Sequence, residues 1–289
     1  MIWHKLDIFC SRDDSFFIEE ILIGLGAISI FIEDNSNKPI YEPEVGETPL
    51  WERLKLSALY DRNISNDEIN SILKFTNFYD FNISHIEDIN WVSNYQKKMQ
   101  PLSFGEKLWV VPSWVKCENI EDKKIIKMNP GMAFGSGSHE TTHLCLEYLE
   151  ANQASNKVVL DYGSGSGILS IAAALLKAKL VFSIDIDPQA KIATKENAKI
   201  NNLEEKIFLL EANEIIDESI DLLIANIIYK QLIESRDFFF MKIKRNGQLI
   251  LSGILRSQVS KLKKAYAKKF RFEKISYKGD WCLIVFSKK

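Results

Sequence analysis

The residues with the clearest chemical potential lie at positions 158–167, which read VVLDYGSGSG. An apolar stretch runs there into Gly163, Gly165 and Gly167. Glycine lets the backbone approach a ligand closely, and a helix that begins after the glycines presents free N–H groups and a partial positive charge. Because ligands of open α/β sheets bind at the carboxyl ends of the strands, this cluster predicts a site for a cofactor that carries a carboxylate or a phosphate.

An acidic residue follows at a spacing that suits a ribose. Asp185 ends the next apolar strand, 22 residues beyond Gly163. A carboxylate in that place can accept hydrogen bonds from the ribose hydroxyls. Asp187 directly precedes Pro188, so we expect it to cap the helix that begins at the proline.

Two cofactors compete for this pattern. A dinucleotide site requires G-x-G-x-x-G, but counted from Gly163 its last position is Ile168. Counted from Gly165, the last position is Ser170. The pattern D-x-G-x-G-x-G, which begins at Asp161, instead resembles the S-adenosylmethionine site of class I methyltransferases. That resemblance favours S-adenosylmethionine as the cofactor.

Residues 139–143 read HETTH, which matches the zinc-protease motif H-E-x-x-H. On a helix, His139 and His143 would share one face, as two zinc ligands must. A third ligand should follow, but residues 157–167 contain only Asp161 as an acid and are typical of a buried strand and turn. A zinc protease is therefore the weaker alternative, and no metal is expected.

Long strand–helix units position these residues. Apolar strands are predicted at 123–127, 158–161, 180–184, 207–211, 221–226 and 248–252, and helices at 139–149, 168–178 and 188–201. Continuous Val, Ile and Leu strands that alternate with helices indicate an α/β fold with a parallel sheet covered on both faces. Residues 270–287 predict two further strands joined at a Lys-Gly-Asp turn, an antiparallel hairpin at the end of the sheet.

The first 88 residues follow a different pattern. Strands are predicted at 3–10, 27–32, 54–60 and 81–86, and helices at 13–24 and 66–76. The second of these helices has Asn66 or Asp67 as its expected cap. The order βαββαβ is the ferredoxin-like arrangement. A short helix that ends before Pro101 predicts a linker over residues 87–100.

The composition is that of a globular protein, with 46% hydrophobic and 26% charged residues and a net charge of −2. Four widely spaced cysteines without a C-x-x-C motif fit the reduced thiols of a cytosolic protein. The longest apolar run, residues 168–176, is much shorter than the ~20 residues of a membrane helix. The acidic N-terminus lacks the apolar core of a signal peptide. We therefore expect a soluble, cytoplasmic protein without a membrane partner.

Charge is distributed unevenly along the chain. Residues 1–88 carry 7 basic and 17 acidic side chains, a net −10, whereas residues 256–289 carry 11 and 2, a net +9. Opposite fields can orient a charged partner, although both segments can equally be solvated faces. The lysine-rich stretch 261–269 predicts a helix with Leu262 and Tyr266 facing inward. A solvated face is favoured there over an RNA contact, so no direct nucleic-acid partner is expected.

Four motifs and the predicted linker together carry a family resemblance. The motifs read NPGMAFGSGSHETTHLCLEYLE, LDYGSGSGILSIAA, IDIDPQA and ANI, and the segment before them reads WVSNYQKKMQPLSFGEKLWVVPSW. They resemble the PrmA family, the methyltransferases that modify large-subunit ribosomal protein eleven. The resemblance covers residues 88–289 by motif and residues 1–87 only by the βαββαβ order.

The resemblance implies a class I methyltransferase domain over residues 101–289, with a Rossmann-like, mostly parallel, seven-stranded sheet that ends in the antiparallel hairpin. It also implies a ferredoxin-like substrate-recognition domain over residues 1–86 and a linker helix over residues 87–100. Members of the family transfer methyl groups from S-adenosylmethionine to lysine ε-amino groups and to the N-terminal α-amino group of their substrate. Ribosomal protein eleven, free or on the ribosome, is therefore the expected partner.

The resemblance also implies which residues bind the cofactor. By motif, the expected contacts are Thr142, Gly163, Asp185 and Asn226, joined by Gly165 of the glycine cluster. The sequence departs from the family where it has Asn129, Glu140 and Ser164 in place of the usual Asp, Pro and Cys. These departures leave the expected cofactor contacts in place.

The expected reaction is an in-line attack of a neutral amine on the sulfonium methyl group. A lysine with a pKa of ~10.4 must first lose its proton, which costs about 4 kcal/mol at a pH near 7.4. We interpret Asn226 as the residue that holds the amine, with a turn residue that ends the strand as the alternative. Phe134 and Met132 are either an apolar wall beside the methyl group or, equally, ordinary anchors of the loop. His139 is a candidate proton acceptor, with helix capping or packing as the alternative. The glycines of residues 131–137 suit a lid.

Two alternatives stay open. A class I methyltransferase that acts on another protein, a small molecule or a nucleic acid would carry the same cofactor motifs. A binding module could keep the cofactor pocket without catalysing transfer. Cofactor binding without methyl transfer to ribosomal proteins would favour the binding module.

Overall fold

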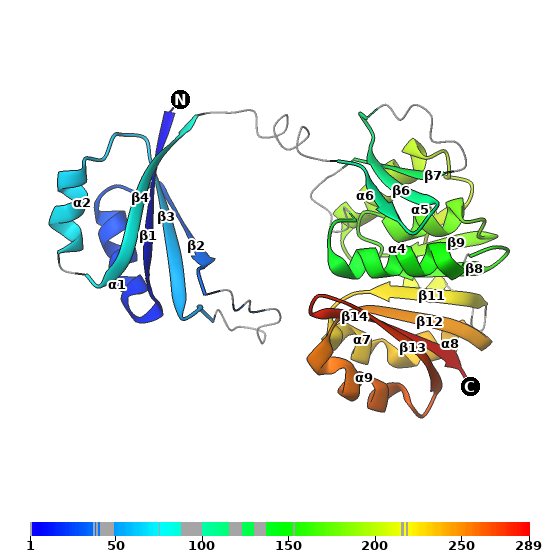
Figure 1. The fold of residues 1–289 in the computed structure, drawn as a ribbon. Coiled ribbons are helices and arrows are strands. Elements are labelled where there is room, and N and C mark those ends of the chain that lie inside the picture. Colours follow the sequence, from blue (N-terminus) through cyan, green and yellow to red (C-terminus); the bar gives the residue numbers. More distant parts are fainter. Residues whose placement is uncertain are drawn as a thin grey trace. The chain divides into compact units, whose positions relative to one another are not determined.

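The computed structural model describes residues 2–36, 38, 40, 49–74, 76–87, 100–115, 123–129, 137–152, 154–214, 217 and 219–289. The chain divides into two compact units, Met1–Tyr95 and Gln96–Lys289 (Figure 1). The division falls within the predicted linker, residues 87–100. The helix predicted for that linker lies outside the described residues.

Unit 1 is a four-stranded antiparallel sheet with two helices packed on one face (Figure 1). Its elements are β1 (Ile2–Ser11), α1 (Arg12–Gly24), β2 (Ser29–Asp34), β3 (Arg53–Tyr60), α2 (Asn66–Leu73) and β4 (Phe78–Glu87). The strands lie in the order β2-β3-β1-β4. Leu6, Ile8 and Leu56 of the sheet form one core with Ile18 and Leu22 of α1. The succession agrees with the predicted βαββαβ order, which a ferredoxin-like unit requires.

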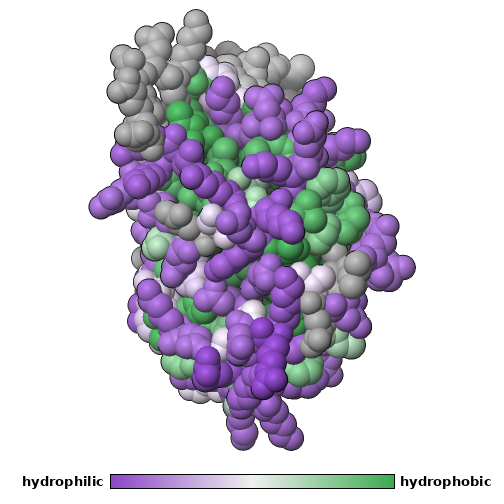
Figure 2. Space-filling model, turned by 90° about the vertical axis from the view of Figure 1, so that its right-hand side faces the viewer, coloured by the Kyte–Doolittle hydropathy of each residue, from purple (hydrophilic) through white to green (hydrophobic). Residues whose placement is uncertain are grey.

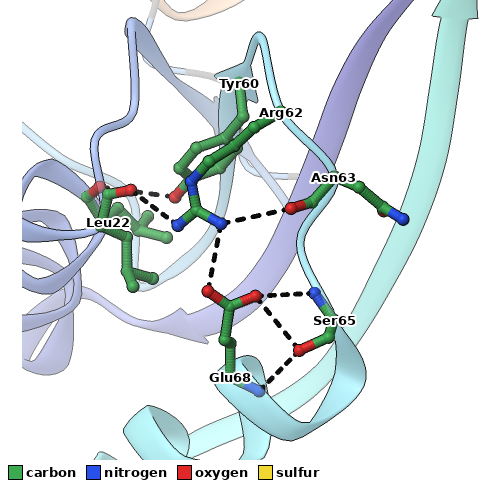
Figure 3. Close-up of polar contacts among 7 residues, drawn as sticks. Leu22, Tyr60, Arg62, Asn63, Ser65 and Glu68 are labelled. Atoms are coloured by element: carbon green, nitrogen blue, oxygen red, sulfur yellow. Dashed lines mark hydrogen bonds and ion pairs between the residues drawn. The ribbon is translucent and has the colours of Figure 1, made fainter.

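Helix α2 begins at a reciprocal cap (Figure 3). The Glu68 N–H donates to Ser65 Oγ over 3.2 Å, and the Ser65 N–H donates to the Glu68 carboxylate over 2.9 Å. Arg62 donates to the same carboxylate over 3.1 Å. The prediction that Asn66 or Asp67 caps this helix is wrong, because the S-x-x-E spacing assigns both halves of a capping box to Ser65 and Glu68.

Unit 2 is built on a seven-stranded sheet in the order β10-β9-β8-β11-β12-β14-β13. The bounds are β8 (Val158–Tyr162), β9 (Leu180–Ile184), β10 (Ile207–Leu209), β11 (Ile220–Asn226), β12 (Ile243–Leu255), β13 (Phe270–Lys278) and β14 (Trp281–Lys288). Strands β10, β9, β8, β11 and β12 are parallel, whereas β14 is antiparallel to both of its neighbours. The predicted sheet and its C-terminal antiparallel hairpin are confirmed.

Helices cover both faces of this sheet (Figure 1). One face carries α4 (Glu140–Asn152), α5 (Ile168–Leu175) and α6 (Pro188–Ile200), and the other carries α7 (Tyr229–Glu234), α8 (Arg236–Lys242) and α9 (Val259–Tyr266). Strand β11 shows why its sequence is apolar throughout. Leu222 and Ile224 belong to the hydrophobic core that includes α4 and α5. Leu223 and Ala225 belong to the core that includes α7, α8 and α9, as expected for a strand buried on both faces.

Helix α9 contains the first part of the lysine-rich stretch, residues 261–266. Leu262 and Tyr266 are fully buried, and the Tyr266 hydroxyl donates to the Leu232 carbonyl over 2.6 Å. Lys261 and Lys264 are exposed. The predicted inward and solvated faces of this helix are therefore confirmed for these residues.

A small sheet precedes α4. It consists of β5 (Leu102–Phe104), β6 (Leu108–Pro112) and β7 (Lys124–Met128), with β6 antiparallel to β5 and parallel to β7. Phe104 and Ile126 join the core that contains α4 and α5. In the part of the chain that the structure describes, none of the helices combines the length and apolar character that crossing a bilayer requires.

Candidate active site

A cavity of about 670 Å³ opens at the carboxyl ends of β8, β9 and β11, where ligands of parallel sheets bind. The predicted site residues that the structure describes all line it: His139, Thr142, Gly163, Gly165, Asp185 and Asn226. Phe134 and Met132 lie outside the described residues. The sequence motifs therefore converge on one cavity.

The glycine turn after β8 is held tightly against its neighbours. The N–H groups of Gly163 and Ser164 both donate to the Ile184 carbonyl, over 2.8 and 3.0 Å. Gly163 has a φ of +78°, and a Cβ at this residue would lie 2.4 Å from Ile227 Cγ2. Only glycine accommodates both the left-handed backbone and this approach. The turn consequently brings main chain, rather than side chain, to the cavity wall.

The carboxylate of Asp185 is oriented by the backbone on both sides. Oδ2 accepts from the Gly165 N–H over 2.8 Å, and Oδ1 accepts from the Asp187 N–H over 2.9 Å. Each carboxylate oxygen has a further lone pair, so two ribose hydroxyls can donate to the same group. Asp187 accepts from the Gln189 N–H over 2.9 Å and is the N-cap of α6, as predicted.

Asn226 and Thr142 are joined across the cavity wall. Asn226 is the last residue of β11, and its Nδ2 donates to Thr142 Oγ1 over 3.3 Å. The bond fixes the plane of the amide. Oδ1 is the acceptor of Asn226 that this bond does not use, so the pair presents an oriented carbonyl oxygen at a strand end.

His139 stands at the start of α4 with its ring against Trp281. Its Nδ1 accepts from the Thr141 N–H over 3.3 Å and lies 2.8 Å from Thr141 Oγ1. The His139 and Trp281 rings meet edge to face with centroids 5.1 Å apart. Because Nδ1 accepts from the backbone, Nε2 carries the proton of the neutral ring. This geometry favours the capping and packing alternative over proton acceptance.

The H-E-x-x-H match has another structural explanation. His143 Nε2 lies 3.0 Å from Glu147 Oε1, one turn further along α4, and its ring packs on Phe104 at 4.8 Å. The His139 ring is engaged with Thr141. Among the residues with described positions, no three His, Cys, Asp or Glu side chains come together as metal ligands. The two histidines are therefore placed as parts of a packed helix.

Asp161 lies fully buried beneath the glycine turn. Its Oδ2 accepts from Ser170 Oγ over 2.6 Å, and that hydroxyl lies 2.7 Å from Ser183 Oγ. Oδ1 has no hydrogen-bond partner within the described part of the chain. Burial raises the pKa of Asp161 to about 6, because a low-dielectric environment disfavours the charged form. The network ties β8 to α5 and β9.

The three departures from the family pattern fit their surroundings. Ser164 Oγ lies 3.1 Å from Thr194 Oγ1, which links the glycine turn to α6. The Asn129 N–H donates to Asn197 Oδ1 over 3.1 Å. Glu140 is the first residue of α4. None of these contacts disturbs the Asp185 carboxylate or the Asn226 amide.

Trp281 and Ile186 are among the parts of the cavity wall that sequence reasoning missed. Trp281 begins β14 and reaches the cavity from the hairpin, which no local motif indicates. Ile186 lines the cavity although it is 87% exposed. An isoleucine between Asp185 and Asp187 is the signal that could have revealed it, since an exposed apolar residue beside a ribose site suits the face of a base.

The fold and the site together define a class I S-adenosylmethionine-dependent methyltransferase. The strand order, with antiparallel β14 between β12 and β13, supports that class, as does the glycine turn at the end of β8. The residues present fit the cofactor. Asp185 suits the ribose, Ile186 suits the adenine, and the turn at Gly163 brings main chain to the cavity wall.

The chain belongs to the PrmA family, because the model described as ribosomal protein L11 methyltransferase (PrmA) matches residues 2–289. It is 38% identical over 294 residues to the ribosomal protein L11 methyltransferase of Shewanella sp. (strain W3-18-1), with 100% of both chains covered. The protein of the same name from Idiomarina loihiensis is 36% identical over 288 residues, 98% of each chain. The crystal structure of the ribosomal protein L11 methylase from Lactobacillus delbrueckii subsp. bulgaricus is similar with a TM-score of 0.62 and 32% identity, covering 66% of this chain and 100% of that one. The resemblance stated from the motifs is confirmed.

Proposed function

We propose that this chain methylates ribosomal protein L11 at lysine ε-amino groups and at the N-terminal α-amino group. The family and the names of its relatives support this substrate. The observation that carries the chemistry is the hydrogen-bonded pair of Asn226 and Thr142 at the wall of the cofactor cavity. A ribosomal substrate implies that the reaction takes place in the cytoplasm.

S-adenosylmethionine supplies an electrophilic methyl group on a positively charged sulfur. Asp185 holds the ribose at the end of β9, with its carboxylate oriented in advance by two backbone N–H groups. Asn226 holds the amine at the end of β11, on the other side of the glycine turn. Because both reactants are bound at rigid strand ends, the bimolecular reaction becomes effectively unimolecular, with the reacting atoms aligned.

The attacking nitrogen must carry a lone pair. Asn226 Oδ1 accepts a hydrogen bond from an amine N–H and, because the amide is neutral, does not favour the ammonium form as a carboxylate would. Trp281 and His139 form an aromatic part of the cavity wall, which would remove the amine from water when it binds. Such desolvation lowers the pKa of a lysine and so offsets part of the ~4 kcal/mol of deprotonation. When bound, the cofactor would supply the methyl group and keep the C–S electron pair on its sulfur, and the amine that gains the methyl group would release a proton to solvent.

We infer that residues 1–86 recognise the substrate protein. The segment 1–88 carries a net charge of −10, and an acidic surface attracts a basic partner from a distance. The division of the chain into two compact units supports separate roles for recognition and catalysis. The predicted linker, residues 87–100, would then connect the two roles.

The test is transfer of labelled methyl groups from S-adenosylmethionine to a mixture of free ribosomal proteins, followed by mass spectrometry of the labelled protein. Wild type is compared with Asp185→Ala and Asn226→Ala, and with Asp187→Asn as a matched control that keeps the helix cap. We expect label on L11, absent in the first two variants and kept in the third.

Three other outcomes of the labelling experiment would change the assignment. Label on a different protein would show that the chain is a methyltransferase with a substrate other than L11. Cofactor binding without label on any ribosomal protein would overturn the substrate assignment and support the binding-module alternative. Full activity of Asn226→Ala would show that Asn226 does not hold the amine.

A further inference from the structure

A second cavity, also about 670 Å³, lies at the end of the unit 2 sheet that is opposite the cofactor cavity. It is lined near the amino ends of β8 and β11 by Lys157 and Asp221, and near the turn of β12 by Lys244 and Arg245. The described residues that line the two cavities do not overlap. A ligand here would bind without competing with the methyl-transfer site.

Positive charge dominates this cavity, which we call the basic groove. Its charged lining residues are Lys157, Lys244, Arg245, Arg271 and Lys274 against Asp221 and Glu273, a net +3 from five cations and two carboxylates. Figure 2 views the molecule from the side that lies to the right in Figure 1 and shows a mainly hydrophilic face. The lining residues thus make the groove a basic depression.

The two carboxylates of the groove are satisfied by the wall itself. Asp221 accepts from Lys244 Nζ over 2.8 Å and from the Val158 N–H over 2.8 Å. Glu273 Oε1 accepts from Arg271 Nε over 2.8 Å and from Ser287 Oγ over 2.6 Å. These bonds fix the positions of two cations and leave the excess positive charge for a ligand.

The neutral lining residues suit a phosphodiester backbone better than a set of bases. Asn152, Asn156, Asn246 and Gln248 add amide donors and acceptors, which bind phosphate oxygens and ribose hydroxyls. Tyr148 is the one aromatic residue among the described lining residues, and it is only 8% exposed. Single-stranded RNA is held by stacking on exposed aromatic rings, so this groove fits the backbone of a duplex.

We propose that the basic groove binds the phosphate backbone of double-stranded RNA, without sequence preference, although the lysine-rich stretch 261–269 alone led us to expect no nucleic-acid partner. The choice of RNA over an acidic peptide rests on the proposed function. Its substrate is a ribosomal protein, and on the ribosome that substrate lies beside folded RNA. The enzyme would hold an RNA helix at one end of the sheet while the other end presents the cofactor cavity.

The test is a fluorescence anisotropy titration of the full chain against a fluorescein-labelled RNA hairpin, repeated over a series of salt concentrations. The groove variant is Arg245→Ala with Lys274→Ala. Both residues are exposed, so the fold should tolerate their replacement. The matched control is Lys261→Ala with Lys264→Ala on the solvated face of α9, which removes the same charge elsewhere.

We expect the groove variant to bind the hairpin about tenfold more weakly and to lower the salt slope by ~0.7 to 0.9 for each phosphate that the variant no longer neutralises. The control variant should bind nearly as wild type does. Equal weakening by both variants, or by neither, would overturn the proposal. Competition by polyglutamate as strong as that by unlabelled hairpin would overturn the assignment to RNA.

The same variants separate this proposal from the proposed function. Neither Arg245 nor Lys274 lines the cofactor cavity, so methylation of free L11 by the groove variant should be unchanged. If wild type transfers no methyl group to L11, the RNA titration still tests the groove on its own.

Discussion

Thr142 and Asn226 lie 84 positions apart in the chain, yet Asn226 Nδ2 donates to Thr142 Oγ1 over 3.3 Å. Thr142 belongs to the first turn of α4, and Asn226 ends β11. The bond therefore exists only when helix and sheet are packed together. We therefore predict that Thr142 is a positioning residue, which acts by holding the amide that we propose to bind the amine.

Replacing Thr142 with valine keeps the shape and removes the acceptor. We expect kcat for L11 methylation to fall about tenfold, since a neutral hydrogen bond contributes ~0.5–1.5 kcal/mol. Thr142→Ser, which retains the oxygen, should recover most of the rate. Steady-state kinetics of both variants test this, and a Thr142→Val enzyme with wild-type kcat would contradict the positioning role.

Asp185→Asn should weaken cofactor binding. The neutral amide replaces the charged group that we propose to accept from two ribose hydroxyls. Hydrogen bonds to charged groups contribute ~1.5–3 kcal/mol, so we expect Kd for S-adenosylmethionine to rise at least tenfold. Asp187→Asn is the control, because asparagine caps a helix as well as aspartate does. Isothermal titration calorimetry that finds the two variants equally impaired would refute the ribose assignment.

Gly163→Ala should destabilise unit 2. The substitution places a Cβ 2.4 Å from Ile227 Cγ2 at a φ of +78°, and a left-handed backbone alone costs ~1–2 kcal/mol in a residue with a side chain. Gly24→Ala, with nothing within 4 Å of its Cβ, should be neutral or stabilise by up to ~1 kcal/mol. Urea unfolding measures both, and an unaffected Gly163→Ala protein would mean that the turn relaxes freely.

The buried carboxyl of Asp161 should make stability depend on pH. Its pKa is raised to about 6 in the folded protein, so between pH ~4 and ~6 the native state binds more protons than the unfolded state. The contribution of Asp161 to the free energy of unfolding should therefore fall as pH rises through this window, by an amount on the order of 3 kcal/mol, and should stay constant above it.

Asp161→Asn has no carboxyl to titrate, so wild type should lose stability relative to this variant across the same window. Urea unfolding of both proteins at several pH values gives the difference. Parallel curves would show that Asp161 does not titrate there.

Local signals account for much of what could be predicted. The apolar strands, the glycine turn at Gly163 and the acid at Asp185 each depend on neighbouring residues, and all lie where the patterns indicated. Asp187 caps its helix for the same reason. The capping box of Ser65 and Glu68 also had a local signature, S-x-x-E, but nearby Asn and Asp residues offered competing caps.

Contacts between distant segments could not be derived in that way. The packing of Trp281 on His139 depends on the end of β14 lying beside the start of α4, and no spacing in the sequence encodes that neighbourhood. The role of His139 likewise follows from its bond to the Thr141 N–H, which exists only once the helix start is formed. The basic groove combines residues from loops and strands at one end of the sheet.

Strand β14 has a partner on each side, β12 and β13, and almost all of its residues are buried. The hairpin of β13 and β14 therefore forms the end of the sheet beside β12. Its removal would expose the edge of β12, and an exposed strand edge promotes aggregation. This arrangement makes the enzyme suited to fragment complementation. A chain that stops before Phe270 should regain its cofactor cavity only when a peptide bearing both strands is supplied, because the same hairpin delivers Trp281.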